Sequence, residues 1–378
     1  MARFLRYLGG AVLFALLVAV TVYIATGPER PASDSLSAQW LESGPYRVGL
    51  AEFAFVDSSR ITEANREAPQ QDQRRLPTTL WYPRNFDGDR LALIIHSHGI
   101  LSSATEMSYL MEALASRGYV VAAPTFPLTS SASPSGANAS DVINQPADVS
   151  FLIDSIMNLD AADKPFSGAI DVDRIGLSGY SLGGLTTYLA TYHVQLRDPR
   201  IDAAVAIAGP SAVFAPRFFD TAALPFLAVA GTADALIEYE RNAENLLDRG
   251  ENMTLVSIEG GSHLGFVGAA EPIFRFMDNP DSIGCSAVLA ALGEDTNALF
   301  AALYNPATGV DRSRDVPGIC ADPVEAAIHP GRQQMINQVA IVSFFESEFS
   351  PDAQRRQQAR QTLQESIAED FEEVRLQQ

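Results

Sequence analysis

The stretch Arg174–Thr187 reads RIGLSGYSLGGLTT and constrains the fold more than any other part of the chain. The apolar run Ile175–Leu177 predicts a buried strand, and the residues from Leu182 onward predict a helix. Between them, Gly-Tyr-Ser-Leu-Gly at 179–183 predicts a tight turn that needs both glycines and raises the oxygen of Ser181 above the sheet edge. The pentapeptide alone also fits an ordinary Gly-rich turn, so its meaning depends on the residues around it.

Apolar runs on both sides of this stretch alternate with helical patterns. Strands are predicted at Tyr46–Val56, Leu76–Tyr82, Leu91–His96, Tyr119–Ala123, Ala203–Ile207, Phe226–Ala230 and Thr254–Ile258. Helices are predicted at Thr105–Arg117, Ala147–Leu159, Tyr239–Arg249 and Gln333–Phe349. This alternation predicts an α/β fold with a mostly parallel central sheet and helices on both faces.

The size of the chain favours one large domain over two small ones. Its 378 residues, 47% of them hydrophobic, suit a single α/β domain over 42–350 with insertions. Residues 266–331 interrupt the alternation and contain the apolar, helix-like stretch Ala287–Tyr304. We expect either a cap over a pocket or an ordinary packed subdomain there. Residues 351–378 are polar and charged, which predicts an exposed helix or a frayed tail.

The N-terminal region, 1–26, resembles an export signal. Leu8–Ala25 is almost entirely apolar and follows Arg3 and Arg6, which predicts an uncleaved signal anchor or a cleaved signal peptide. No small-x-small cleavage site follows, which favours the anchor. Residues 27–41 predict a linker. Either reading places the rest of the chain outside the cytoplasm: membrane-anchored, or periplasmic or secreted after cleavage.

Charge and cysteine content narrow the partners and the compartment. A formal net charge of −20 disfavours nucleic acid as a partner. Cys285 and Cys320 are the only cysteines. In an oxidising compartment they are candidates for a disulfide that stabilises the fold by about 3–4 kcal/mol, with two unpaired buried thiols as the alternative.

An acid and a histidine follow the Ser181 turn in the order needed for nucleophilic catalysis. Asp234 comes just after the strand Phe226–Ala230, and His263 follows Thr254–Ile258 in a Gly-rich loop. The carboxyl ends of parallel strands meet at one edge, so the three side chains are expected to converge. Histidine can accept the serine proton near neutral pH, and aspartate can orient the ring and stabilise its protonated form.

Other roles for these two residues remain open. Asp234 also fits a turn or helix-capping residue, in which case Glu238 is the substitute acid. His263 also fits a turn or capping histidine.

An oxyanion hole needs two amide donors. One is predicted at Leu182, the residue after the nucleophile. The second is predicted at Ile100, because Gly99 lets the loop after Leu91–His96 approach closely; Leu101 is the alternative.

The other histidines do not predict a metal centre. His96 and His98 lack a third ligand at suitable spacing, so no metal and no cofactor are expected, and His98 is interpreted as a support for its loop. His193 and His329 are predicted to be surface or structural residues.

Several of these motifs together resemble a known family. The chain resembles the predicted dienelactone hydrolases related to platelet-activating factor acetylhydrolase at His96–Gly99, Leu114–Pro127, Asn144–Pro146 and Gly179–Gly184. The likeness spans about Tyr46–Ile258 plus His263 and weakens over 266–331.

The resemblance implies an α/β-hydrolase fold and metal-free cleavage of carboxylic esters through an acyl-enzyme. It implies Ser181 as nucleophile, Asp234 as acid, His263 as base, and the Ile100 and Leu182 amides as oxyanion donors. True dienelactone hydrolases use cysteine where this chain has Ser181, so the lactonase activity is not carried over. Cutinase-type polyester hydrolases share the same Gly-x-Ser-x-Gly-Gly turn.

We therefore expect a serine hydrolase that acts on small or lipid-like carboxylic esters, such as an esterase or lipase. An acyltransferase with the same three residues and a cutinase-like polyester hydrolase are the alternatives. A non-catalytic binding protein is disfavoured, because all three side chains and the donor loop are present.

Overall fold

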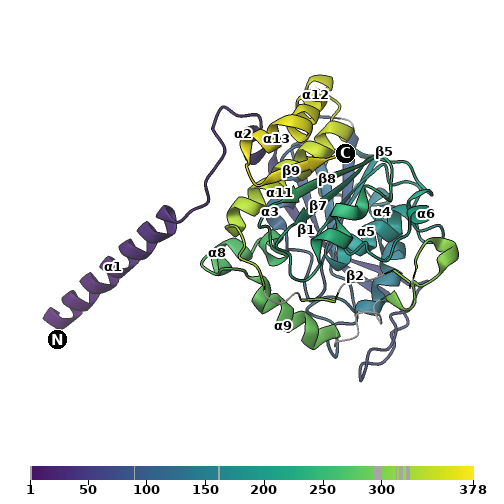
Figure 1. Cartoon of the computed structure of the whole chain (residues 1–378), viewed down its shortest axis with the longest axis horizontal. Helices are drawn as coiled ribbons and strands as arrows, with labels where there is room; N and C mark the ends of the chain where they lie inside the picture. The colour runs from purple at the N-terminus through teal and green to yellow at the C-terminus, as the bar shows by residue number, and fades with distance from the viewer. Residues whose placement is uncertain are drawn as a thin grey trace.

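The structure is a computed structural model that describes residues 2–88, 90–160, 162–292, 300–311, 313–314, 318–320 and 324–378. The strands of these residues form one nine-stranded sheet in the order β1-β2-β4-β3-β5-β6-β7-β8-β9 (Figure 1). Their bounds are β1 Arg47–Asp57, β2 Arg74–Arg84, β3 Arg90–Ser97, β4 Tyr119–Pro124, β5 Ala169–Tyr180, β6 Ala203–Ile207, β7 Phe226–Gly231, β8 Met253–Ile258 and β9 Val374–Gln377. Strands β4, β3 and β5–β8 run parallel, and antiparallel strands close the two edges.

Helices connect and cover these strands. Their bounds are α1 Ala2–Ala25, α2 Ala38–Leu41, α3 Ser108–Ala115, α4 Gln145–Met157, α5 Leu182–Tyr192, α6 Pro216–Phe219, α7 Tyr239–Asn242, α8 Ala270–Phe274, α9 Asp281–Leu292, α11 Pro330–Phe349, α12 Ala353–Gln361 and α13 Ile367–Asp370.

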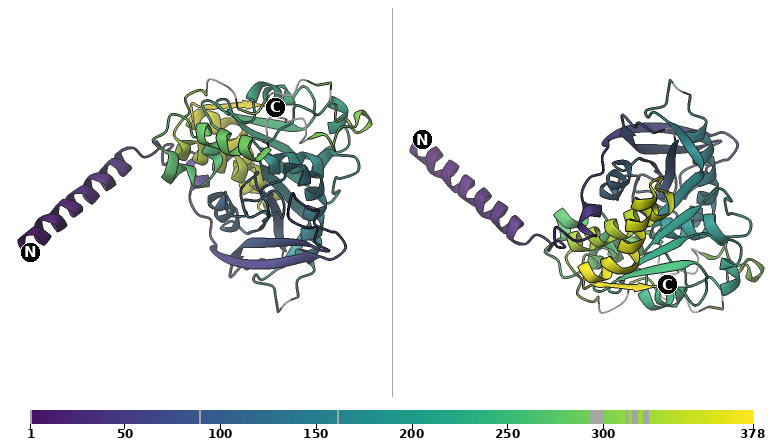
Figure 2. Two further views of the ribbon diagram at one scale, coloured as in Figure 1. Left: turned by 90° about the horizontal axis from the view of Figure 1, so that it is seen from below. Right: turned by 90° about the horizontal axis from the view of Figure 1, so that it is seen from above.

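Strand β3 shows why both faces of the sheet are covered. Leu93 and Ile95 belong to the apolar cluster that includes α4 and α5, whereas Ile94 belongs to the cluster that includes α3 and α11. All three side chains are fully buried. Successive strand residues point to opposite faces, so a continuous apolar run requires a cover on each side. Figure 2 shows helices on both sides of the sheet, which confirms the predicted fold class.

The prediction of an exposed helix or a frayed tail over 351–378 holds only in part, because the segment is largely helical but packs against α11 and the sheet edge. These residues form α12, α13 and β9, and β9 pairs antiparallel with β8 at the edge of the sheet. Ala359, Leu363, Ile367 and Phe371 are buried in the cluster that contains α11. Their spacing of four residues puts them on one helical face, and the charged residues between them occupy the solvent side.

Two helix predictions hold only in part. The stretch Tyr239–Arg249 is helical over α7 and continues as a 3₁₀ turn at Glu244–Leu246. The helix breaks at Ala243, whose φ is −118°. The stretch Ala287–Tyr304 begins inside α9, which ends at Leu292, and residues 293–299 lie outside the described residues.

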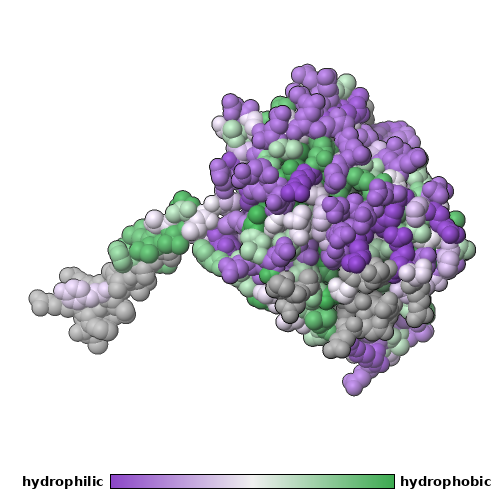
Figure 3. Space-filling view, in the orientation of Figure 1, coloured by the Kyte–Doolittle hydropathy of each residue, from purple (hydrophilic) through white to green (hydrophobic). Residues whose placement is uncertain are grey.

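The N-terminal helix α1 stands away from the rest of the chain (Figure 1). Its end is held to α8, because the Tyr23 hydroxyl donates to Glu271 at 3.0 Å and Arg275 donates to the Thr26 carbonyl at 2.7 Å. Apolar residues of α1 face solvent, in contrast to the largely hydrophilic surface of the main body (Figure 3). Within the described part of the chain, we find no helix with the length and apolarity needed to cross a membrane.

The predicted linker over 27–41 is docked at its end. Its last residues form α2, where Trp40 is buried and its indole nitrogen donates to the Thr362 hydroxyl at 2.9 Å. The linker therefore ends against the C-terminal segment.

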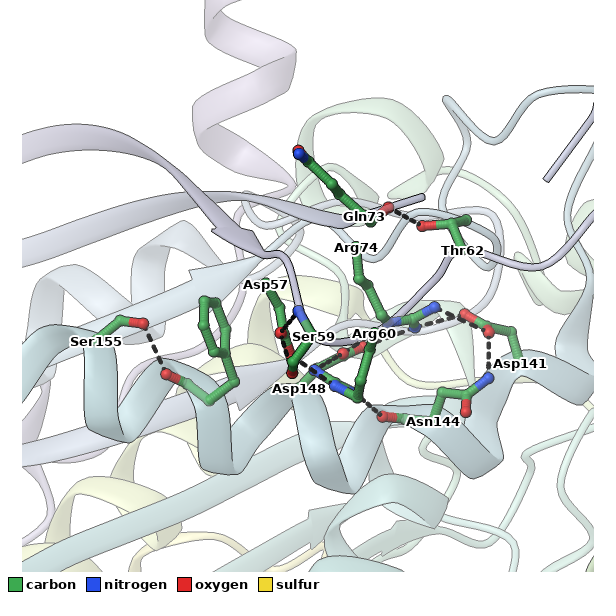
Figure 4. Close-up of polar contacts among 11 residues, drawn as sticks. Asp57, Ser59, Arg60, Thr62, Gln73, Arg74, Asp141, Asn144, Asp148 and Ser155 are labelled. Atoms are coloured by element: carbon green, nitrogen blue, oxygen red, sulfur yellow. Dashed lines mark hydrogen bonds and ion pairs between the residues drawn. The ribbon is translucent and has the colours of Figure 1, made fainter. Parts of the chain in front are cut away.

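A buried ion-pair network braces the long segment Pro124–Gln145 (Figure 4). Arg74, at the start of β2, donates to Asp141 at 2.7 Å and to Asp148 at 2.6 Å. Arg60 reaches the same Asp148 carboxylate at 2.8 Å. All but Arg60 are almost fully buried, so the network fixes this segment and the start of α4 to the sheet.

Candidate active site

Ser181 occupies a strained turn between β5 and α5. Its φ of 55° and ψ of −117° lie in a region that residues with a side chain rarely adopt. A Cβ on Gly179 would lie 2.0 Å from the Gly183 carbonyl oxygen, and one on Gly183 would lie 1.9 Å from that of Ser97. Only glycine fits at either position, so the two glycines of the motif permit the turn that carries Ser181.

The structure brings Ser181, His263 and Asp234 together from three separate strand ends. His263 Nε2 lies 2.8 Å from Ser181 Oγ, and His263 Nδ1 lies 2.7 Å from Asp234 Oδ2. The other Asp234 oxygen accepts the Leu236 and Ile237 amides at 2.9 and 2.7 Å. The carboxylate therefore accepts a hydrogen bond from Nδ1–H, which keeps the proton on Nδ1 and leaves Nε2 free to accept the serine proton.

The substitute acid does not reach the imidazole. The Glu238 carboxylate instead accepts the Arg241 amide at 2.9 Å, as the N-cap of α7. Of the two carboxylates, Asp234 is thus the one that contacts the imidazole.

The electrostatic surroundings of His263 favour its protonated form. Burial alone lowers the pKa of the imidazole, but the carboxylates of Asp234, Asp281 and Glu106 outweigh burial. The pKa of His263 is consequently raised above its ordinary value. A base with a raised pKa accepts a proton more readily. When the pH is lowered, such a base also becomes protonated at a higher pH than an ordinary histidine, and the protonated ring can no longer accept a proton.

Hydrogen bonds occupy two amides of the loop after β3. The Leu101 amide donates to the Thr129 carbonyl at 2.9 Å, which removes it as the alternative donor. The Gly99 amide donates to Glu106 at 3.0 Å. Within the described residues, this leaves Ile100 as the loop amide available to a ligand, beside Leu182, the first residue of α5.

His98 holds the loop after β3 in place through two hydrogen bonds. Its Nε2 accepts the Phe126 amide at 3.0 Å and its Nδ1 donates to the Gly99 carbonyl at 2.6 Å. Burial lowers the pKa of His98, so the ring is held neutral in one tautomer. His96 is also buried, with Nδ1 2.8 Å from Ser178 Oγ.

The two remaining histidines have structural contacts. His193 is buried at the end of α5 and accepts the Gln195 amide at 3.3 Å, and His329 caps α11 by accepting the Gly331 amide at 3.0 Å. In the part of the chain that the structure covers, no group of three or more His, Cys, Asp or Glu side chains is arranged to hold a metal ion.

Cys285 and Cys320 form a disulfide with a Cα–Cα distance of 5.5 Å. Cys285 lies on α9 and packs in a small apolar cluster with Ala235 and Leu236, directly after Asp234. The disulfide therefore ties α9 down beside the loop that carries the acid.

Sequence reasoning missed three residues that surround His263. The Tyr180 hydroxyl donates to the His263 carbonyl at 2.9 Å, Glu106 fastens the donor loop, and Asp281 binds the loop of His263 itself. Glu106 falls within a predicted helix and Asp281 within an irregular region, so no local pattern marks either carboxylate. Of the three, only Tyr180 had a signal in the sequence, because it lies inside the serine motif.

Comparison with known proteins places these observations in a family. A model of the PET hydrolase-like family matches residues 77–278, more than half of the chain. A solved ferulic acid esterase from Streptomyces cinnamoneus is similar with a TM-score of 0.53 and 18% identity, over 79% of this chain and 89% of that one. No curated protein matches the sequence, and neither comparison supports the narrower likeness to platelet-activating factor acetylhydrolase. The chain belongs to the PET hydrolase-like family and is a carboxylic ester hydrolase of the α/β-hydrolase fold.

Proposed function

We propose that Ser181 is the nucleophile of this hydrolase, His263 its general base and acid, and Asp234 the residue that orients the imidazole. The observation that carries the proposal is the continuous hydrogen-bond chain from Ser181 Oγ through His263 to Asp234. A serine hydroxyl is a weak nucleophile unless a base within hydrogen-bond reach removes its proton.

The reaction proceeds in two halves. Ser181 Oγ attacks the ester carbonyl carbon while His263 Nε2 takes the hydroxyl proton, and the same proton then passes to the departing alkoxide. The acyl group remains on Ser181 until water, deprotonated by His263, attacks it. His263 then returns that proton to Ser181 Oγ as the acyl–oxygen bond breaks and the carboxylic acid leaves. In both halves the amides of Ile100 and Leu182 stabilise the negative oxygen; loss of one such donor typically costs about 10²–10³ in kcat.

We propose small aromatic or lipid-like carboxylic esters as the substrate class. The family match supports terephthalate-type esters, and the sequence resemblance supports acyl lipids. An acyltransferase would pass through the same acyl-enzyme and differ only in whether an alcohol replaces water.

A panel of p-nitrophenyl esters from acetate to palmitate, together with bis(hydroxyethyl) terephthalate, tests the function and ranks the substrates. We expect the purified wild-type protein to hydrolyse at least one of them, and Ser181→Ala to lose that activity. The control is Ser167→Ala, which removes an exposed hydroxyl ahead of β5. Full activity in Ser181→Ala contradicts the proposal, and a transesterified product with added alcohol identifies acyl transfer.

We also propose that the described part of segment 266–331, through α9, shapes the acyl site as a cap. Helix α9 packs beside the acid loop, and Ile283 and Leu289 on it are 48% and 36% exposed. Replacing both by serine should reduce the preference for long over short acyl chains in the same ester panel. An unchanged preference would leave the segment as an ordinary packed subdomain.

For the location, we propose that the protein works outside the cytoplasm. The Cys285–Cys320 disulfide is typical of an oxidising compartment, and the apolar run Leu8–Ala25 resembles an export signal. Fractionation of cells that express the full chain, with thiol alkylation of each fraction, tests this. A protein found in the cytoplasm with both thiols free would contradict it, and the membrane fraction separates anchoring from release.

A further inference from the structure

The triad depends on two loops that come from different strands. Asp234 lies in the loop after β7, and His263 in the loop after β8. A shift of either loop would separate His263 from its acid or from Ser181. Placement errors near 1 Å at a reacting centre can reduce rates by about 10²-fold, so a feature that couples the loops has functional weight.

Asp281, the first residue of α9, bonds to both loops. Its Oδ2 accepts the Ala235 amide at 3.0 Å and the His263 amide at 2.8 Å. Its Oδ1 accepts the Leu264 amide at 2.8 Å. The Asp281 carboxylate thus joins the amide of Ala235, next to Asp234, to the amides of His263 and Leu264.

The environment of Asp281 explains why its carboxylate can be buried. The residue has no exposed surface, and burying an unpaired charge is costly. Three amide donors offset that cost, because hydrogen bonds to an ionised acceptor are stronger than those between neutral groups. Asn279 fixes the position by accepting the Asp281 amide at 2.8 Å while donating to the Ala233 carbonyl at 3.1 Å.

The charge of Asp281 also acts on His263. The charged groups that act on the imidazole are Asp234, Asp281 and Glu106. The neutral ring of Tyr180 lies beside it, tilted by 34°, with the ring centroids 5.0 Å apart. Asp281 in turn faces Asp234 and His263. A second buried carboxylate therefore favours the positively charged imidazole that forms when Ser181 gives up its proton.

We propose that Asp281 is a positioning residue for the triad: it locks the acid loop to the histidine loop and adds a second negative charge behind the imidazole. This inference rests on the proposed function. The serine proton still moves to His263 Nε2. Burial and Asp234 raise the pKa of Asp281, and the amides of Ala235 and Leu264 oppose that rise.

The test compares Asp281→Asn with Asp278→Asn, an exposed aspartate three residues earlier with no side-chain contact to the triad. Asparagine keeps the size and one acceptor oxygen but loses the charge. We expect kcat to fall about 10- to 100-fold with KM little changed. The acidic limb of the kcat/KM profile should move to lower pH, because the pKa of His263 falls when a neighbouring carboxylate is neutralised. Asp278→Asn should match wild type.

A second variant separates position from charge. Asn279→Ala removes the bonds that hold Asp281 but keeps its carboxylate, so kcat should fall while the acidic limb stays in place. Active sites are counted with a fluorophosphonate titration, so that misfolded protein does not enter kcat. The inference is overturned if Asp281→Asn has the same kcat as wild type and the acidic limb of its kcat/KM profile lies at the same pH. If that variant does not fold, a wild-type kcat in Asn279→Ala overturns it. A wild-type protein with no esterase activity would instead refute the proposed function.

Discussion

Arg74 offers the sharpest test of how the fold holds the loops around the site. Its guanidinium makes four hydrogen bonds to the Asp141 and Asp148 carboxylates, and its side chain is 1% exposed. The change Arg74→Met keeps much of the buried volume and removes the cation. Two buried carboxylates then remain with weaker compensation: Arg60 at Asp148, and the Asn144 amide at Asp141.

The magnitude follows from the loss of one partner of a buried ion pair, which costs about 3–5 kcal/mol. At about 2.1 cal/mol/K per residue, unfolding this chain of 378 residues has an entropy of about 0.8 kcal/mol/K. We therefore expect Tm to fall by about 4–6 °C in a calorimetric scan if the domain unfolds as one unit. The control Arg75→Met removes the exposed neighbouring cation and should shift stability by less than about 0.5 kcal/mol.

The pH dependence of this difference checks the cause. Burial raises the pKa of Asp148, and Arg74 opposes that rise. Without Arg74 the pKa of the carboxyl rises further, and a group whose pKa is higher in the folded state stabilises that state as the pH falls. The gap in Tm between wild type and Arg74→Met should therefore narrow from pH 7 toward pH 5. An unchanged Tm, or equal losses in Arg74→Met and Arg75→Met, would refute the reasoning.

Three further predictions concern the triad and the disulfide. Asp234→Asn should lower kcat by about 10⁴-fold in an ester assay, because an amide no longer holds the imidazole in the required tautomer; a loss below tenfold would contradict the role. The acidic limb of wild-type kcat/KM should have its midpoint above pH ~6.5, the ordinary pKa of histidine, because the pKa of His263 is raised and only the neutral ring accepts the serine proton; a midpoint below that value would contradict the electrostatic argument. Replacing Cys285 and Cys320 by serine should cost about 3–4 kcal/mol of unfolding free energy, measured by urea titration; no loss would indicate that the bridge does not constrain the unfolded chain.

Much of the site could be predicted from the sequence because its parts follow strand ends. Ser181, Asp234 and His263 each stand just beyond an apolar run, and parallel strands deliver such residues to one edge. The choice between Ile100 and Leu101 could not be made from the sequence. It depends on the Thr129 carbonyl, which comes from a distant loop and occupies the Leu101 amide.

The C-terminal segment shows the limit of reading by composition. Residues 351–378 contain many charges, yet every fourth residue from Ala359 to Phe371 is buried against α11. The number of charged residues does not show that the apolar residues lie on one helical face, whereas their four-residue spacing does. Asp281 and Arg74 could not be predicted in this way. Whether a single charged residue is buried and paired depends on partners that lie far away in the sequence.

Labelling with a fluorophosphonate probe tests the central claim most directly, since the probe reacts with a serine oxygen only where a base activates it. The wild-type protein should be labelled at Ser181, identified by peptide mass, and Ser181→Ala should remain unlabelled. Labelling of His263→Ala should be strongly reduced, although its serine is intact. Undiminished labelling of Ser181→Ala, or equal labelling of wild type and His263→Ala, would contradict a serine activated by this histidine.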